Sequence, residues 1–145
     1  MAAVSYIPAG YHTVTPYLIV KGASTLIDFL KKVFDGQEIE RMTKPDGTIG
    51  HAEVRVGDSV VMLGEAPGEW KPTPSTLHVY VKDADATYAK ALQAGAKSLR
   101  EPADQFYGDR QSGVTDPVGN CWWISTHVED VSPDEMKRRA EAAMR

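Results

Sequence analysis

Two residues able to carry out acid–base or metal chemistry stand two positions apart in the first half of the chain. His51 and Glu53 belong to Gly50–Val56, in which polar and apolar residues alternate. This alternation is typical of a strand with one polar face, so the two side chains should lie together. With His78, they are candidates for a general base beside a substrate carbonyl or for zinc ligands. The favoured alternative is that all three are polar groups of a half-buried sheet, hydrogen-bonded to their neighbours.

A sequence repeat indicates which elements position these residues. Val20-Lys21-Gly22-Ala23 opens one amphipathic stretch, and Val81-Lys82-Asp83-Ala84 opens another 61 positions later. Two copies of one plan predict a fold with two equivalent halves. In such folds the ligand site often lies where the copies face each other.

The first half, residues 13–65, is predicted to contain one helix and four strands. Ser24 is the expected N-cap of the helix, and Gly36 ends it. Apolar residues recur at helical spacing between these two positions. The strands are expected over 13–20, 38–44, 50–56 and 59–65. A proline-rich linker over 66–75 follows, with Trp70 exposed in its middle.

The second half, residues 76–127, repeats this order. Asp83 or Asp85 is the expected helix cap, and Gly95 closes the helix. A C-terminal helix over 132–144 begins with a capping Ser132. The strands are expected over 76–82, 97–101, 109–115 and 121–126, with a longer loop over 102–108.

The bulk properties favour one globular domain over residues 1–145 in the cytoplasm. The net charge is −4 and no basic stripe is present, which argues against a nucleic-acid partner. A single cysteine, Cys121, excludes an internal disulfide. The N-terminus lacks the pattern of a signal peptide, and no stretch approaches the roughly 20 apolar residues that span a bilayer. We therefore expect no membrane association.

Several short motifs, in this order and spacing, resemble the glyoxalase/bleomycin-resistance/dioxygenase superfamily, also called vicinal oxygen chelate, and within it the PhnB-like branch. The resemblance covers the chain from Val14 onward. It implies an α+β fold in which two tandem βαβββ units form an incomplete barrel, with a concave pocket and the helices on the outer face. It also implies a homodimer. The motifs are Gly50-His51-Ala52-Glu53-Val54, Leu77-His78-Val79-Tyr80-Val81, Gly108-Asp109-Arg110, Asp116-Pro117-Val118-Gly119-Asn120, and the segment from Trp122 to Asp130.

In that family, metal-dependent members place His, Gln or Glu ligands on the first and last strands of each unit. The repeat assigns these four positions to Thr15, Met62, Thr76 and Trp123. Threonine is a poor ligand for divalent metals, methionine sulfur suits copper(I), and tryptophan does not coordinate. We therefore predict no cofactor and no metal at these positions, unless the alignment is displaced by two residues. A divalent metal at His51, Glu53 and His78 is the alternative.

Strand alternation predicts what lines the concave face instead. Trp70 and the Phe106–Tyr107 loop are expected to cover the mouth of the pocket. Arg110 either meets an anionic group of the ligand or, as we favour, pairs with Asp109 or Asp116. The expected lining residues are Thr15, Tyr17, Ile19, Met62, Thr76, His78, Tyr80, Trp123 and Ser125.

Three functions are compatible with such a pocket. The first is binding of a small planar or apolar molecule without chemistry, as in bleomycin resistance. The second is a lyase, isomerase or dioxygenase, metal-dependent or using His51, Glu53 or His78 as a base. The third is a dimeric regulatory domain with a vestigial pocket. We favour the first and leave open whether the protein is an enzyme.

Overall fold

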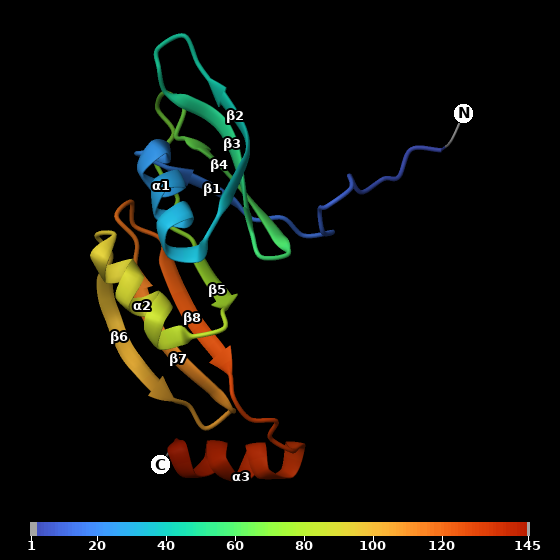
Figure 1. Cartoon of the computed structure of the whole chain (residues 1–145), viewed down its shortest axis with the longest axis vertical. Helices are drawn as coiled ribbons and strands as arrows, with labels where there is room; N and C mark the ends of the chain where they lie inside the picture. The colour runs from blue at the N-terminus through green and yellow to red at the C-terminus, as the bar shows by residue number, and fades with distance from the viewer. Residues whose placement is uncertain (1–2, 145) are drawn as a thin grey trace. The chain divides into compact units, whose positions relative to one another are not determined.

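The computed structural model describes residues 3–144 and divides them into two compact units. One contains the chain up to Ser75 together with Pro117–Gly119, and the other contains Thr76–Asp116 and the chain from Asn120 onward. Each unit holds a four-stranded mixed sheet and a helix against it, and the second also carries the C-terminal helix (Figure 1). This α+β arrangement confirms the predicted fold class.

The sheet of the first unit has the strand order β1-β4-β3-β2. Strands β1 and β4 are parallel, and the other pairs are antiparallel. The helix α1 lies across one face of this sheet (Figure 1), and the opposite face, which α1 does not cover, is called the open face. The elements are β1 (Tyr17–Val20), α1 (Ala23–Phe34), β2 (Gln37–Thr43), β3 (Ile49–Val56) and β4 (Ser59–Glu65).

The face under α1 is the apolar core of the first unit. Successive strand residues point to opposite faces, so every second position of β1, β3 and β4 contributes to the core. The helix contributes one apolar stripe, and fully burying each such side chain stabilises the fold by about 1.5–3 kcal/mol. The buried residues are Leu18, Val20, Ala52, Val54, Val61 and Leu63 of the sheet, and Leu26, Ile27, Leu30 and Val33 of α1.

The helix α1 begins differently from the prediction. Its N-cap is Gly22 and not Ser24, so the cap residue has no side chain that could accept a hydrogen bond from the helix. Instead, Glu65 at the end of β4 accepts hydrogen bonds from the backbone N–H groups of Gly22 (2.7 Å) and Ala23 (3.4 Å). The negative charge of this carboxylate also interacts favourably with the positive N-terminal end of the helix dipole. Gly22 fits the N-cap because its φ is 99°, a region that L-residues rarely adopt.

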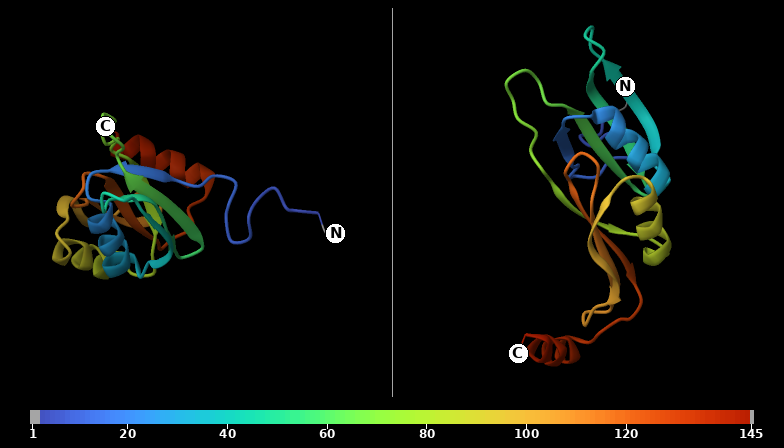
Figure 2. Two further views of the ribbon diagram at one scale, coloured as in Figure 1. Left: turned by 90° about the horizontal axis from the view of Figure 1, so that it is seen from above. Right: turned by 90° about the vertical axis from the view of Figure 1, so that its left-hand side faces the viewer.

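The second unit repeats the plan with the strand order β5-β8-β7-β6. Asp83 caps its helix by accepting from the backbone N–H of Ala86, as one predicted alternative proposed. Thr126, near the end of β8, accepts from the N–H of Ala84. The helix α2 runs along one face of the sheet (Figure 2). The elements are β5 (Thr76–Tyr80), α2 (Ala84–Gln93), β6 (Lys97–Asp104), β7 (Asp109–Thr115) and β8 (Cys121–His127).

The strand register supports the repeat of 61 residues. Tyr17 of β1 pairs with Met62 of β4, and His78 of β5 pairs with Trp123 of β8. Each residue of the second pair lies 61 positions after its counterpart in the first. Neither sheet closes on itself, because β1 and β2 are the edges of one and β5 and β6 the edges of the other.

Two strand boundaries differ from the prediction by more than two residues. β1 begins only at Tyr17, because Pro16 precedes it and the hydroxyl of Thr15 bonds back to the carbonyl of His12. β6 continues to Asp104 and so takes in the first part of the expected loop over 102–108. Pro102 is tolerated there because β6 is an edge strand with an irregular register.

The C-terminal helix α3 (Pro133–Ala143) starts as predicted, with Ser132 accepting from the backbone N–H of Glu135. Arg139 anchors it to the second unit by donating to the carbonyl of Phe106 and to the carboxylate of Glu129. Hydrogen bonds from Arg138 and Arg139 lower the pKa of Glu135 to about 2. Among the described helices, none is long and apolar enough to cross a membrane.

Candidate functional site

The open face of the first sheet carries a row of side chains that crosses all four strands. Tyr17 pairs with Met62, Met62 with Glu53, and Glu53 with Glu40. Directly paired residues point to the same side of a sheet, so these four side chains share the face opposite α1. His51 stands two positions before Glu53 and therefore faces the same way, as the sequence predicted. This face is the candidate site of the first unit.

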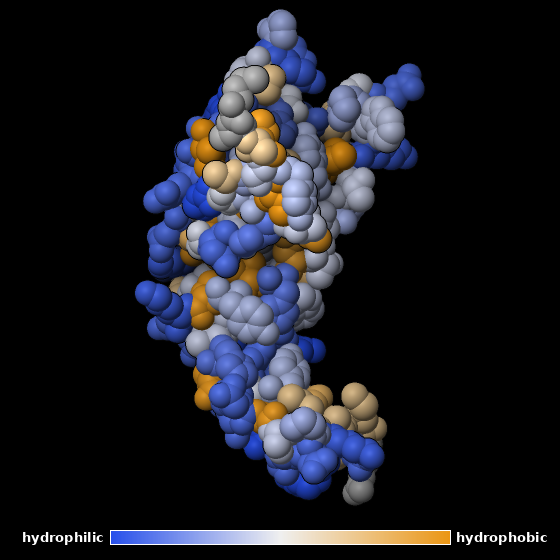
Figure 3. All heavy atoms as spheres, turned by 90° about the vertical axis from the view of Figure 1, so that its right-hand side faces the viewer, coloured by the Kyte–Doolittle hydropathy of each residue, from blue (hydrophilic) through white to orange (hydrophobic). Residues whose placement is uncertain are grey.

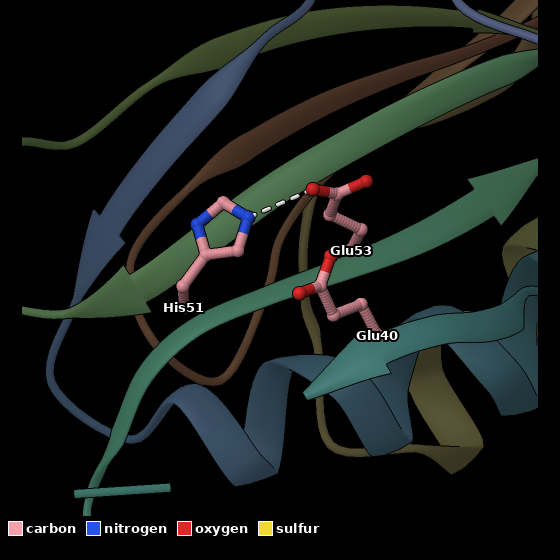
Figure 4. A group of neighbouring side chains, drawn as sticks. All are labelled: Glu40, His51 and Glu53. Atoms are coloured by element: carbon pink, nitrogen blue, oxygen red, sulfur yellow. Dashed lines mark hydrogen bonds and ion pairs between the residues drawn. The ribbon is translucent and has the colours of Figure 1, made fainter. Parts of the chain in front are cut away.

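His51 is held between two partners, Glu53 and Tyr17, of which Figure 4 draws Glu53. Its Nε2 lies 2.8 Å from Oε2 of Glu53, and its Nδ1 lies 3.1 Å from the hydroxyl of Tyr17. The Tyr17 ring packs near the imidazole, with 5.5 Å between ring centres. The ring of His51 is thus fixed by hydrogen bonds at both of its nitrogens.

Glu53 is the most buried polar residue of this site, with only 5% of its surface exposed. Burial acts to raise the pKa of Glu53, but hydrogen bonds from His51 and Tyr11 outweigh burial and the pKa is lowered. The same bond to Glu53 raises the pKa of Tyr11. Glu53 is therefore a carboxylate held in its charged form.

Two residues that the sequence did not single out complete the site. Tyr11, in the segment before β1, donates its hydroxyl to Glu53. Glu40 of β2 presents its carboxylate so that one ligand atom each of Glu40, His51 and Glu53 lie within 4.8 Å of one another. The third predicted member, His78, belongs to β5 of the second unit.

The open face of the second sheet is aromatic. Arg100, Gly113, Trp123 and His78 form one row across the four strands. The Trp123 ring lies over Gly113, since a Cβ atom at residue 113 would be 2.3 Å from its Cζ3. The guanidinium carbon of Arg100 lies 5.4 Å from the Trp123 ring centre, within cation–π range. Tyr80 is 65% exposed, and its ring centre is 4.9 Å from that of His78.

Hydrogen bonds order the polar end of this second face. Tyr80 donates to one carboxylate oxygen of the buried Asp109, and His127 bonds to the other at 2.8 Å. His127 also bonds to Asp130 at 2.7 Å, and these two carboxylates, Asp130 foremost, raise its pKa. Burial, and then the hydrogen bond to Asp109, raises the pKa of Tyr80.

The remaining predicted site residues occupy varied positions. Ser125 is buried and accepts from Gln111, which in turn accepts from the hydroxyl of Tyr107. Trp70 is 73% exposed, as predicted. Thr76 is an exposed residue at the start of β5, and Thr15 lies before β1.

Arg110 has other partners than those predicted. It pairs with Asp85 at 2.7 Å and with Asp104 at 3.2 Å, and not with Asp109 or Asp116. The reason is strand alternation: Arg110 points to the side of β7 that α2 covers, where Asp85 lies. Arg110 is therefore a structural link between α2 and the sheet.

The metal site usual in the superfamily that the sequence resembles does not fit these residues. In the register of the strands, Tyr17 stands beside Met62 and His78 beside Trp123. The residues level with Met62 and Trp123 are thus Tyr17 and His78, which lie two positions after the predicted Thr15 and Thr76. Even so, His78 is the one position of the four that carries a usual ligand for a divalent metal. The donor set does not suit a metal there.

Comparison with known proteins agrees with this architecture. The sequence profile of the Glyoxalase/Bleomycin resistance protein/Dioxygenase superfamily matches residues 11–124. An uncharacterized protein of Mycobacterium bovis is 37% identical over 134 residues, covering 85% of this chain and 88% of that protein.

Solved structures of other proteins share this fold. TioX of Micromonospora sp. ML1 matches with a TM-score of 0.69 and 25% identity, over 81% of this chain and 99% of TioX. A PhnB protein of Bacillus cereus matches in fold, with a TM-score of 0.66 and 18% identity over 79% of this chain and 99% of its own. The chain belongs to the glyoxalase/bleomycin resistance protein/dioxygenase superfamily.

Proposed function

We propose that this protein binds a small planar or apolar molecule, in the manner of the bleomycin-resistance members of its superfamily. The open face of the β5–β8 sheet provides the main recognition surface. The observation that carries the proposal is the placement of Trp123, whose ring lies over a strand that has glycine at the contact point. Aromatic side chains spread across a sheet offer flat surfaces on which a planar ligand can stack.

The neighbours of Trp123 support this proposal. His78 and Tyr80 lie side by side on the edge strand β5, and Tyr80 is largely exposed. Gln111 and Ser125 add hydrogen-bonding groups beside the rings. On the face shown in Figure 3, hydrophobic side chains reach the surface in separate patches set among hydrophilic ones. A surface of rings with a few polar groups is typical of small-molecule sites.

The proposal includes two finer points that follow from family resemblance. We propose that the chain belongs to the PhnB-like branch, on the motifs that carry the resemblance, and the PhnB protein of Bacillus cereus has the same fold. We also propose a homodimer, as the resemblance implies. Light scattering coupled to size-exclusion chromatography would measure the oligomeric state, and a monomer at micromolar concentration would contradict it.

Thermal-shift screening with planar aromatic compounds tests the binding function. A true ligand at a hundredfold excess over its dissociation constant stabilises the protein by about 2.7 kcal/mol. Trp123→Ala should abolish the shift, and Trp123→Phe should retain part of it. Leu92→Ala, which changes an exposed residue of α2, is the matched control and should leave the shift unchanged. A shift that survives Trp123→Ala would contradict the proposal.

A second candidate function is a lyase, isomerase or dioxygenase that uses the first unit. It is favoured by the charged, buried Glu53, which is hydrogen-bonded to His51 and is placed to act as a base. His51→Ala distinguishes the two functions once a ligand is known. If His51→Ala loses turnover and keeps binding, the protein is an enzyme. If the substitution changes neither property, binding alone is supported.

A further inference from the structure

We propose that Glu40, His51 and Glu53 form a binding site for a divalent transition-metal ion on the open face of β2 and β3. This site differs from the positions that the superfamily's metal-dependent members use, which lie on the first and last strands of each unit. All three residues belong to the first sheet, whereas the proposed ligand surface belongs to the second.

The sheet register brings the three side chains together. Glu40 of β2 is the cross-strand partner of Glu53 in β3, and His51 precedes Glu53 by two positions on the same face. Figure 4 shows the imidazole and the two carboxylates converging from these two strands, with candidate ligand atoms within 4.8 Å of one another. Atoms bound to one ion at about 2.1 Å lie roughly 3–4 Å apart, so small side-chain rotations would complete the site.

The charge balance of the cluster favours a cation. Glu53 is buried, and the carboxylate of Glu40 has no hydrogen bond or ion pair with any residue from 3 to 144. The two nearby arginines are engaged elsewhere: Arg41 with Glu38, and Arg55 with the carbonyl of Gly10. Two carboxylates this close repel each other unless positive charge lies between them. His51 offers at most one such charge.

Tyr17 orients the imidazole as a metal ligand requires. Its hydroxyl is hydrogen-bonded to Nδ1 of His51, and Nε2 is therefore the ring nitrogen that faces the carboxylates. Histidines that bind metals in proteins almost always have the second ring nitrogen held by a hydrogen bond in this way. Tyr17 is thus a positioning residue for the ion and not one of its ligands.

The donor set defines the class of ion. One imidazole nitrogen with two carboxylate oxygens suits zinc, manganese, iron(II) or cobalt, whereas Mg²⁺ and Ca²⁺ prefer oxygen ligands alone. Three protein ligands leave further coordination positions for water or for an oxygen of a small molecule.

Metal titration of the full chain tests the inference. Protein purified without a His tag and stripped with EDTA would be titrated with Zn²⁺, Co²⁺ and Mn²⁺ by isothermal calorimetry. We expect one equivalent to bind. Glu40→Gln and His51→Gln should each weaken binding at least tenfold, and Tyr17→Phe should weaken it by about 10- to 100-fold. Glu40→Gln changes an exposed residue, and its melting temperature would confirm that it folds.

Two variants serve as matched controls. Glu38→Gln removes a carboxylate from the same strand but from the helix-covered face, where Glu38 pairs with Lys31 and Arg41. His78→Ala removes the one usual ligand among the superfamily's metal positions. Both should bind metal as the unaltered chain does. The inference is wrong if no ion binds stoichiometrically, if Glu40→Gln binds normally, or if His78→Ala alone loses binding. Trp123→Ala should keep the metal, which separates this test from that of the ligand surface.

Discussion

The ring of Trp123 lies so close over Gly113 that residue 113 has no room for a side chain. A Cβ atom there would lie 2.3 Å from Cζ3 and 2.6 Å from Cε3 of the Trp123 ring. The two residues are cross-strand partners in β7 and β8, so the contact is direct. The missing side chain thus allows the indole to lie flat across the sheet.

Gly113→Ala should therefore displace Trp123. Because the ring must move to admit the methyl group, we expect a loss of about 1–3 kcal/mol in the free energy of unfolding. Urea denaturation measures the loss, and near-UV circular dichroism reports the indole. The same substitution made in Trp123→Ala should cost much less. An equal cost in both backgrounds would mean that Trp123 is not the obstacle.

A second prediction concerns how α1 starts. Glu65→Ala removes the carboxylate that accepts from Gly22 and Ala23, and should reduce stability by about 0.5–2 kcal/mol. Ser24→Ala is the matched control and should change stability little, because Ser24 does not cap the helix. If urea denaturation shows the larger effect for Ser24→Ala, the capping assignment is wrong.

A third prediction concerns Ser112, which is buried on the helix-covered face of β7. Its hydroxyl has no hydrogen-bond partner among the described residues. A buried hydroxyl without a partner carries a desolvation cost, so Ser112→Ala should stabilise the protein, by roughly 1 kcal/mol. A raised urea midpoint would confirm this. A clear loss of stability would show that the hydroxyl has a partner.

A fourth prediction concerns pH and His127. Hydrogen bonds to Asp130 and then Asp109 raise the pKa of His127 above its ordinary 6.5. A raised histidine pKa stabilises the fold at pH values below 6.5, and this stabilisation is lost as pH rises through the folded-state pKa. NMR titration of the imidazole should show the raised pKa, and Asp130→Asn should lower it. A value at or below 6.5 in the unaltered chain would contradict the assignment.

The fold could be predicted because its signals are local and occur twice. Alternation in Gly50–Val56 predicts a strand with one polar and one apolar face. The 61-residue repeat then predicts the equivalent elements in the other half of the chain. The same alternation placed His51 beside Glu53. Alternation also predicts that Tyr17 shares a face with Met62 and His78 with Trp123, and the strand pairing agrees.

The rest of the candidate site depends on long-range geometry. Glu40 meets Glu53 only because β2 pairs with β3 in a register that contains a bulge between Glu38 and Glu40. Tyr11 reaches Glu53 from a segment without helix or strand, which has no periodicity to read. The cap of α1 was missed because Glu65 lies over 40 positions from the helix start. The repeat offers one signal for this cap: Thr126, 61 positions after Glu65, also accepts from the first turn of its own helix.

The most direct test of the proposed function is an NMR titration that follows the indole Nε1–H signals of the three tryptophans. Trp123 lies on the open face of the second sheet, whereas Trp122 is buried and donates to Asp116. With a planar aromatic compound that binds, we predict large shifts for Trp123 and for the ring of His78, and small shifts for Trp122. Binding that leaves the Trp123 and His78 signals unmoved would contradict the account.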